Sequence, residues 1–201
     1  FPGSGGFLYQ EELFMSQDKT PDIRLEPVAE TELSAYEALY CDAFPASERK
    51  PFALLKTRAA EGTAELLSIR FDGIFAGLAV TLLDGPYVLI DYLAVSPAFR
   101  NHGIGASGLG LLRARYPDRL LFLEIEEPET EIQERRRNFY IRNGILPTGL
   151  AVKLFGVDML ILSDGGRNVP FDDYAALLLH TVGPYTVGNV TFRSFTPQNN
   201  A

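Results

Sequence analysis

The sequence predicts an α/β fold, with a mixed, mostly antiparallel sheet flanked by helices and followed by a C-terminal helix and a β-rich tail. Two observations predict it. Strand-like segments joined by tight turns fill much of the first half, and a strand–helix–strand unit follows in the middle of the chain. Because hairpins and such a unit occur together, we expect a mixed sheet whose faces are covered by helices.

The N-terminal part predicts one short strand and two helices. Residues 23–28 alternate apolar and polar side chains, as a strand does. Thr31 is expected to cap a helix with an apolar face made by Leu33, Tyr36, Ala38, Leu39 and Tyr40. Pro45 ends this helix because proline cannot continue a helix interior. A second helix is expected at about 48–60.

Three strands are expected next, at 65–71, 74–83 and 87–95. They are separated by Asp72-Gly73, which strongly favours a hairpin, and by Asp84-Gly85-Pro86.

The second half begins with an expected helix at 103–116 and a strand at 120–126. The next helix, at 130–143, has the best-marked limits, because Thr130 and Gln133 form a capping box and Gly144 can take the left-handed conformation. The remaining elements are expected at about 150–155 and 157–162 (strands), 171–182 (helix) and 185–195 (β-rich tail).

A chain of 201 residues can bury one sizeable core and is short for two domains. We expect residues 1–14 to be a leader or a cloning remnant, since Phe-Pro-Gly-Ser-Gly-Gly precedes any amphipathic pattern. Residues 15–163 should form the main domain, and 164–201 a C-terminal extension packed on it.

Charge and composition narrow the classes of partner. A net charge of -8 argues against general nucleic-acid binding, which needs a surplus of Lys and Arg. This negative charge fits either an ordinary acidic surface or an electrostatic field that attracts cationic amines, and composition does not choose between the two. No stretch is apolar enough for a membrane span, since the best, 87–95, is short and contains Asp91. The single Cys41 and the lack of a secretory pattern favour a soluble, cytoplasmic protein; a homodimer is possible.

Residues 100–106, Arg-Asn-His-Gly-Ile-Gly-Ala, join a predicted strand to a predicted helix. Glycines allow the backbone to approach a ligand, and free N–H groups at a helix start bind anions, so the turn favours a phosphate; a plain loop is the alternative. Gly105, Gly108 and Gly110 each cost the helix about 1 kcal/mol relative to Ala, which predicts close packing against it. The preceding hairpins disfavour a Rossmann unit, and the Gly-Lys-Ser/Thr of a Walker loop is missing.

This turn, preceded by Leu93-Ala94-Val95, resembles motif A of the GNAT acetyltransferases, and 138–145, Asn-Phe-Tyr-Ile-Arg-Asn-Gly-Ile, resembles their motif B. The resemblance covers about 23–162 and implies a GNAT-like fold and acetyl-CoA as cofactor. It departs from the family at Gln133, where many relatives have Asn, and at Ile145, where many have Phe. The implied cofactor-binding residues are Leu93, Val95, Arg100, Asn101, His102, Gly103, Ile104, Gly105, Ala106 and Gln133.

The resemblance implies an N-acetyltransferase that moves the acetyl group of acetyl-CoA to a primary amine, on a small molecule or a peptide, by direct attack. The alternatives are a non-catalytic acyl-CoA-binding regulatory module and, less favoured, a nucleotide-binding α/β domain. Deprotonating a lysine-like amine at neutral pH costs about 4–5 kcal/mol, so a base is useful.

Asp91, in the middle of an apolar strand, is the first candidate for this base, and an outward-facing Asp is the alternative. Glu124 and Glu126 are expected on the same face of their strand. They either form an acidic wall, in which Glu124 assists catalysis and Glu126 binds substrate, or are solvated side chains. Tyr140 is expected to protonate the leaving thiolate, or to be a core aromatic. Phe44 and Glu48 are expected to bind the acceptor. Two scattered His and one Cys make a zinc site improbable.

Overall fold

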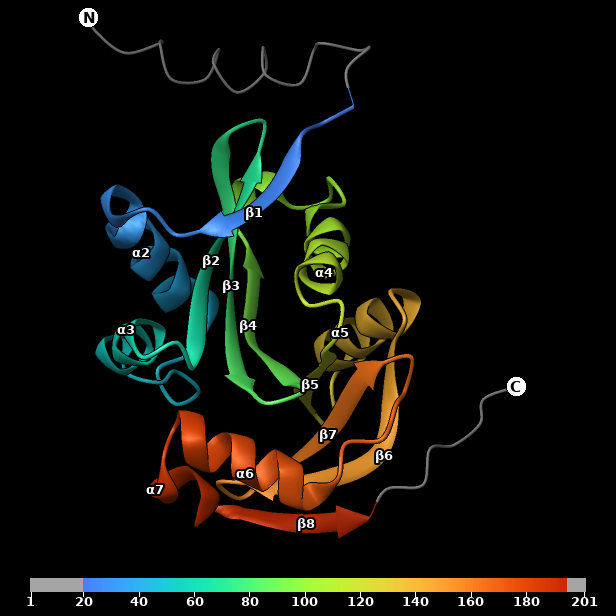
Figure 1. The fold of residues 1–201 in the computed structure, drawn as a ribbon. Coiled ribbons are helices and arrows are strands. Elements are labelled where there is room, and N and C mark those ends of the chain that lie inside the picture. Colours follow the sequence, from blue (N-terminus) through green and yellow to red (C-terminus); the bar gives the residue numbers. More distant parts are fainter. Residues whose placement is uncertain (1–19, 195–201) are drawn as a thin grey trace, which may run out of the picture.

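The computed structural model describes residues 20–194, and the predicted leader, residues 1–14, lies outside them. Eight strands form one sheet in the order β1-β2-β3-β4-β5-β7-β6-β8 (Figure 1). Of the strand pairs in the described chain, β4 and β5 alone run parallel. The strands are β1 (Ile23–Pro27), β2 (Ala64–Phe71), β3 (Ile74–Asp84), β4 (Tyr87–Val95), β5 (Leu120–Glu126), β6 (Ile145–Leu154), β7 (Val157–Asp164) and β8 (Val190–Ser194).

Helices cover both faces of the sheet. Figure 1 shows α4 (Ile104–Arg115) and α5 (Glu131–Arg142) on one side, and α2 (Leu33–Ala43) and α3 (Phe52–Ala60) on the other. The face of α2 and α3 also carries α6 (Phe171–Thr181), whose core cluster includes Leu82 of β3, Phe122 of β5 and Ile161 of β7. The short helices are η1 (Glu30–Glu32), η2 (Pro97–Phe99) and α7 (Pro184–Val187). The mixed α/β fold predicted from the sequence is thus confirmed.

Strand alternation divides the core between the two faces. Leu67 and Ala79 pack with Leu109 of α4, whereas their neighbours Leu66 and Val80 pack beneath α2 and α3. The two layers are therefore built from adjacent residues of the same strands.

The sheet opens between β4 and β5. Their pairing covers only Tyr87–Leu89 and Leu120–Phe122, and no pairing follows it along the described strands. In the same region, Val80 pairs with Tyr92 while Thr81 pairs with Ile90, so Asp91 is the extra residue of a β-bulge. The bulge bends β4 where the two strands separate, which leaves room for a ligand between them.

Several local predictions are confirmed. Asp72 and Gly73 make the first hairpin turn with φ of 48° and 81°. Thr130 and Gln133 form both bonds of the capping box of α5, and Gly144 has a φ of 76°.

Four predicted boundaries are wrong. Thr31 does not cap α2, because it lies within η1 and the N-cap is Glu32, without a side-chain bond. The second helix begins at Phe52 rather than near residue 48, because Pro51 fits only at its start. The tail expected at 185–195 begins as the helix α7, which Pro184 initiates, before β8. β6 begins at Ile145 rather than near 150 and has an irregularity between Pro147 and Ala151.

The division at residue 163 stays a prediction, although β8, from the expected extension, pairs with β6 in the same sheet. Within residues 20–194, each helix is too short or too polar to cross a membrane.

Candidate active site

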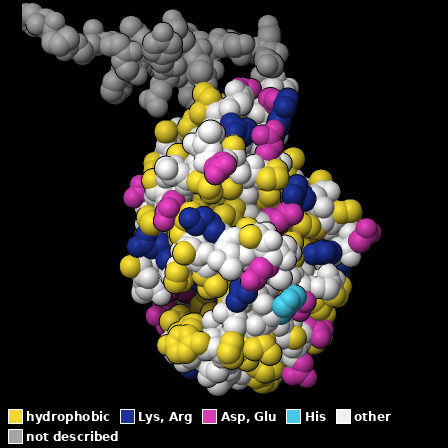
Figure 2. Space-filling view, turned by 60° about the vertical axis from the view of Figure 1, so that its left-hand side comes forward, with side chains coloured by type: hydrophobic (Ala, Val, Ile, Leu, Met, Phe, Trp, Pro, Cys, Tyr) yellow, Lys and Arg dark blue, Asp and Glu magenta, His cyan; other side chains and the backbone are white. Residues whose placement is uncertain are grey.

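A cleft of about 1210 Å³ runs through the opening between β4 and β5. Residues 90–95 of β4 and 123–126 of β5 line its two sides. It reaches the start of α4 on one face of the sheet and the α2–α3 connection and α6 on the other. Figure 2 shows a hollow in the lower part of the molecule, bordered below by hydrophobic side chains.

The phosphate turn predicted from the sequence lines this cleft. Asn101 and Gly103 have φ of 65° and 74°, and α4 begins directly after them. The first backbone bond of the helix runs from Ser107 N–H to Gly103 O (3.0 Å), so the N–H groups of residues 104–106 precede the hydrogen-bond ladder. Arg100 adds a cation to the lining. The turn thus offers the donors that an anion at a helix start requires.

The expected close packing against α4 is found at two of its three glycines. A Cβ on Gly105 would lie 3.2 Å from Phe139 Cζ, and one on Gly108 would lie 3.1 Å from Ile69 Cδ1. Gly110 has no such neighbour within 4 Å, so the prediction is wrong there. The first two glycines let α4 approach α5 and the sheet, which brings motifs A and B together.

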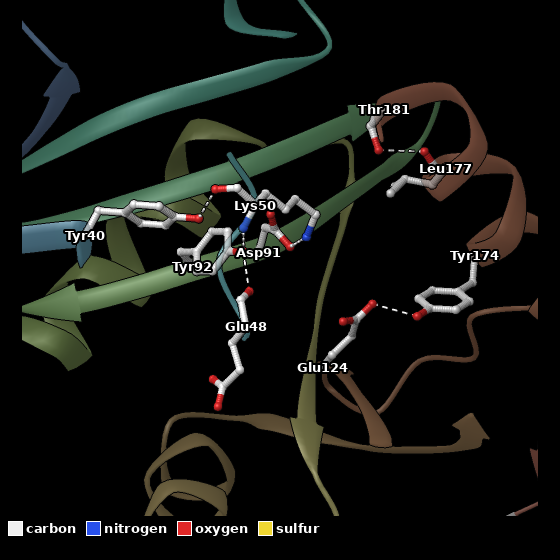
Figure 3. Close-up of polar contacts among 9 residues, drawn as sticks. All are labelled: Tyr40, Glu48, Lys50, Asp91, Tyr92, Glu124, Tyr174, Leu177 and Thr181. Carbon is white, nitrogen blue, oxygen red and sulfur yellow. Dashed lines mark hydrogen bonds and ion pairs between the residues drawn. The ribbon is translucent and has the colours of Figure 1, made fainter. Parts of the chain in front are cut away.

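Asp91 is buried, with 5% of its side chain exposed, and its Oδ1 lies 2.7 Å from Lys50 Nζ (Figure 3). Burial lowers the pKa of Lys50, but the carboxylates of Asp91 and Glu124 outweigh it and hold that pKa above its ordinary value. The Oδ2 atom of Asp91 is buried without a hydrogen-bond partner among the described residues. Asp91 is therefore held by a fixed cation, which the sequence did not indicate.

Two tyrosines fix the backbone that carries Lys50. The Tyr92 hydroxyl accepts a bond from Lys50 N–H (2.9 Å) and donates one to Glu48 O (2.8 Å), while the Tyr40 hydroxyl donates to Lys50 O (3.0 Å). Phe44 packs edge-on against the Tyr92 ring, with centroids 4.8 Å apart. The α2–α3 connection is thereby pinned to β4 at the cleft.

Glu124 of β5 lies on the same sheet face as Lys50 and accepts a bond from the Tyr174 hydroxyl of α6 (2.7 Å; Figure 3). Burial raises the pKa of Glu124; Asp91 adds to this, and Lys50 and Tyr174 oppose it. A carboxyl group in a cleft with such a pKa is a candidate general base.

Tyr140 enters the cleft from α5, on the opposite face of the sheet. Its ring packs against that of Phe139 (5.2 Å) and against the core beneath α4, so both of its predicted surroundings, cleft and core, are present. Burial raises its pKa, and Arg136 opposes this. Within residues 20–194 its hydroxyl makes no hydrogen bond, and the raised pKa favours the protonated form.

The other predicted site residues are placed as follows. Phe44, Glu48 and Glu126 line the cleft, as do Leu93, Val95 and residues 103–106. Partial burial and Glu126 raise the pKa of Glu48, and Arg136 opposes this. Two predicted residues are not among the cleft-lining ones. Gln133 instead caps α5 and donates to Glu126 Oε2 (2.6 Å), and the His102 ring lies 6.0 Å from that of Phe71.

Sequence reasoning missed Lys50 and Tyr174, because each meets its partner only through tertiary structure. A lysine directly before Pro51, at a predicted helix boundary, resembles any solvated lysine. Tyr174 occupies a regular apolar position of an amphipathic helix, so its pattern predicts core.

Comparisons with known proteins agree with this geometry. A model of the Acetyltransferase (GNAT) family matches residues 32–144, whereas a search of curated sequences finds no match. Among solved structures, a protein from Bacteroides thetaiotaomicron described as a GNAT acetyltransferase has a TM-score of 0.65 and 23% identity, covering 80% of this chain and 98% of its own.

Two further structures were solved with ligands of the cofactor class. A GNAT family acetyltransferase from Elizabethkingia anophelis with acetyl-CoA bound has a TM-score of 0.53 and 18% identity, with 73% of this chain and 98% of its own covered. Naa50 from Arabidopsis thaliana, in complex with the bisubstrate analogue CoA-Ac-MVNAL, has a TM-score of 0.53 and 18% identity, with 70% and 97% covered. The family model covers more than half of the chain and the fold agrees with it, so the chain belongs to the GNAT family of acetyltransferases.

Proposed function

We propose that this acetyltransferase moves the acetyl group of acetyl-CoA to a primary amine, which attacks the thioester directly. The observation that carries the proposal is one cleft through the sheet, with a helix start that offers free N–H groups on one face and a part-buried carboxyl group, Glu124, on the other. The two substrates would enter from opposite faces and meet between β4 and β5.

The cleft fits acetyl-CoA, which supplies the activated acyl group. The N–H groups of residues 104–106 and the Arg100 guanidinium would hold its pyrophosphate. The backbone of Leu93 and Val95, beyond the end of the β4–β5 pairing, would face the thioester carbonyl.

Glu124 is the base that we propose, in place of Asp91. The ion pair with Lys50 occupies one of the two carboxylate oxygens of Asp91. Glu124, by contrast, is bound by a neutral phenol, and its raised pKa brings its basicity closer to that of an amine. Together with Glu48 and Glu126 it gives the acceptor side an acidic lining, which attracts an ammonium group before Glu124 accepts its proton.

Tyr140 would donate a proton to the departing thiolate. It comes from α5 on the cofactor side, and its raised pKa keeps the hydroxyl protonated at neutral pH. This separation of base and acid on the two faces suits a reaction in which the amine and the thiol lie on opposite sides of the acyl carbon.

Two measurements test the proposal. Thermal-shift titrations with acetyl-CoA, CoA, ATP and NAD should show stabilisation by the two CoA species only. Thiol release from acetyl-CoA, measured over a panel of amines, should then identify an acceptor. Stabilisation by acetyl-CoA without amine-dependent thiol release would instead favour a non-catalytic acyl-CoA-binding module.

A further inference from the structure

The acceptor side of the cleft has an uncharged, apolar end. Within the described chain, the cleft-lining residues of the β6–β7 hairpin and of the α6–α7 segment, connections included, carry no charge. They include Leu154, Phe155, Val157, Met159, Val182 and Tyr185. Three of these are large hydrophobic residues that are nonetheless exposed: Phe155 (49%), Val157 (44%) and Tyr185 (77%). Exposed apolar side chains that gather at a cleft indicate a binding surface.

Phe155 occupies a position that its side chain disfavours. It forms the β6–β7 turn with Gly156, and the two have φ of 48° and 83°. A bulky residue with positive φ is rare in such a turn, where Asn, Asp or Gly is usual. The centroid of the Phe155 ring lies 5.6 Å from that of Tyr185, which belongs to helix α7. The strained turn thus holds an aromatic pair at the rim of the cleft.

Helix α6 links this apolar end to the proposed base. Tyr174, which bonds Glu124, is followed at four-residue intervals by Leu178 and Val182, both in the cleft lining. Residues at this spacing share one helix face, about 6 Å apart along the axis. An amine held at Glu124 would therefore have apolar surface within about one to two helical turns.

From this arrangement we infer the acceptor class, on the basis of the function proposed above: a primary amine joined to an apolar group of about phenyl size by a flexible linker that spans more than one helical turn, about four carbons or longer. Glu124, with Glu48 and Glu126, would take the ammonium end, and the Phe155–Tyr185 pair with Val182 would take the apolar end. A second charge on the acceptor would meet no counter-charge at that end.

Acetylation kinetics with three amines of equal linker length test this inference: 4-phenylbutylamine, butylamine, which has the same amine and linker without the ring, and 1,4-diaminobutane, in which a second amine replaces the ring. We expect kcat/KM for 4-phenylbutylamine to exceed the other two by about tenfold to hundredfold, as burial of one ring allows. Equal values, or a preference for the diamine, would overturn the inference and leave the proposed function intact.

Variants locate the effect. Phe155→Gly and Tyr185→Ala should each lower kcat/KM for 4-phenylbutylamine several-fold, on the order of the loss of one apolar contact surface, and leave kcat/KM for butylamine unchanged. Both residues are exposed, and Gly suits the φ of residue 155, so the thermal stability of Phe155→Gly should be equal or higher. The control is Leu179→Ala, at an exposed α6 residue outside the cleft lining, which should change neither amine.

Calorimetric binding of the same amines to the CoA-saturated protein separates the two proposals. If no amine is acetylated while 4-phenylbutylamine binds about tenfold more tightly than butylamine, and Tyr185→Ala removes this difference, the proposed function fails and the apolar site stands. If 4-phenylbutylamine binds no better than butylamine, the inference fails.

Discussion

Replacing Lys50 with Met would leave the carboxylate of Asp91 buried without its cation. Loss of one partner of a buried pair costs about 3–5 kcal/mol, and since 23% of the Lys50 side chain is exposed, we expect about 3 kcal/mol. For a chain of this length, that free energy lowers Tm by roughly 6–12 °C.

Replacing Asp91 with Asn should cost less, about 1–2 kcal/mol. Lys50 would keep an anion nearby, because Glu124 also raises its pKa. In the double variant both charges are gone, so the two losses should not add, and a coupling free energy of about 1–3 kcal/mol is expected.

Urea and thermal unfolding of the two single variants and the double variant measure this coupling. The matched control is Lys153→Met, which breaks a pair of equal length, Lys153 to Asp158 (2.7 Å), whose side chains are 44% and 40% exposed. A surface pair should contribute about 0–1 kcal/mol. Equal destabilisation by Lys50→Met and Lys153→Met, or additive effects at Lys50 and Asp91, would refute the view that Asp91 is held by a buried ion pair.

Three further predictions concern the site. Gly103→Ala, at a φ of 74°, should strain the turn by about 1–2 kcal/mol and raise the Kd for acetyl-CoA, measured by calorimetry. The control is Gly110→Ala, which has no neighbour within 4 Å and should stabilise the helix by about 1 kcal/mol at unchanged Kd. Equal Kd values for the two variants would contradict the role of the turn. The folded-state pKa of Glu124 lies above its ordinary value of 4.5, so its contribution to stability is lost as the pH rises from the ordinary pKa through the folded-state pKa. The unfolding free energy of Glu124→Gln should therefore exceed that of the parent by an amount that grows from about pH 4 to 7. A difference that stays constant with pH would contradict the raised pKa. Tyr140→Phe should lower kcat by about 10²-fold to 10⁴-fold without weakening acetyl-CoA binding, and thiol release at the parental rate would exclude it as the acid.

Features carried by neighbouring residues could be predicted from the sequence, and those that depend on distant ones could not. Asp72-Gly73 and the Thr130–Gln133 box need only a few adjacent residues to form, and both were predicted. The bonds from Lys50 to Asp91 and from Tyr174 to Glu124 join residues 41 and 50 positions apart. Local patterns contain no information on such pairs, so Asp91 was predicted as a base while its cation was overlooked.

The helix start near residue 48 was wrong for a related reason. The sequence predicted a helix from about residue 48, but Pro51 sets its start, and the residues before it form a turn and a non-helical segment in which Lys50 N–H bonds the Tyr92 hydroxyl. That segment places Lys50 in the cleft. The error in secondary structure and the missed site residue thus have one cause.

The most direct test of the central claim is the pH dependence of acetyl transfer, measured as acetylated amine and released CoA thiol by the parent and by Glu124→Gln. We predict equal amounts of the two products, and an acidic limb of kcat/KM in the parent that lies above the ordinary carboxyl pKa and is missing in the variant. Acetyl-CoA binding without any acetylated amine between about pH 6 and 9 would contradict the claim, and so would an unchanged pH profile in the variant.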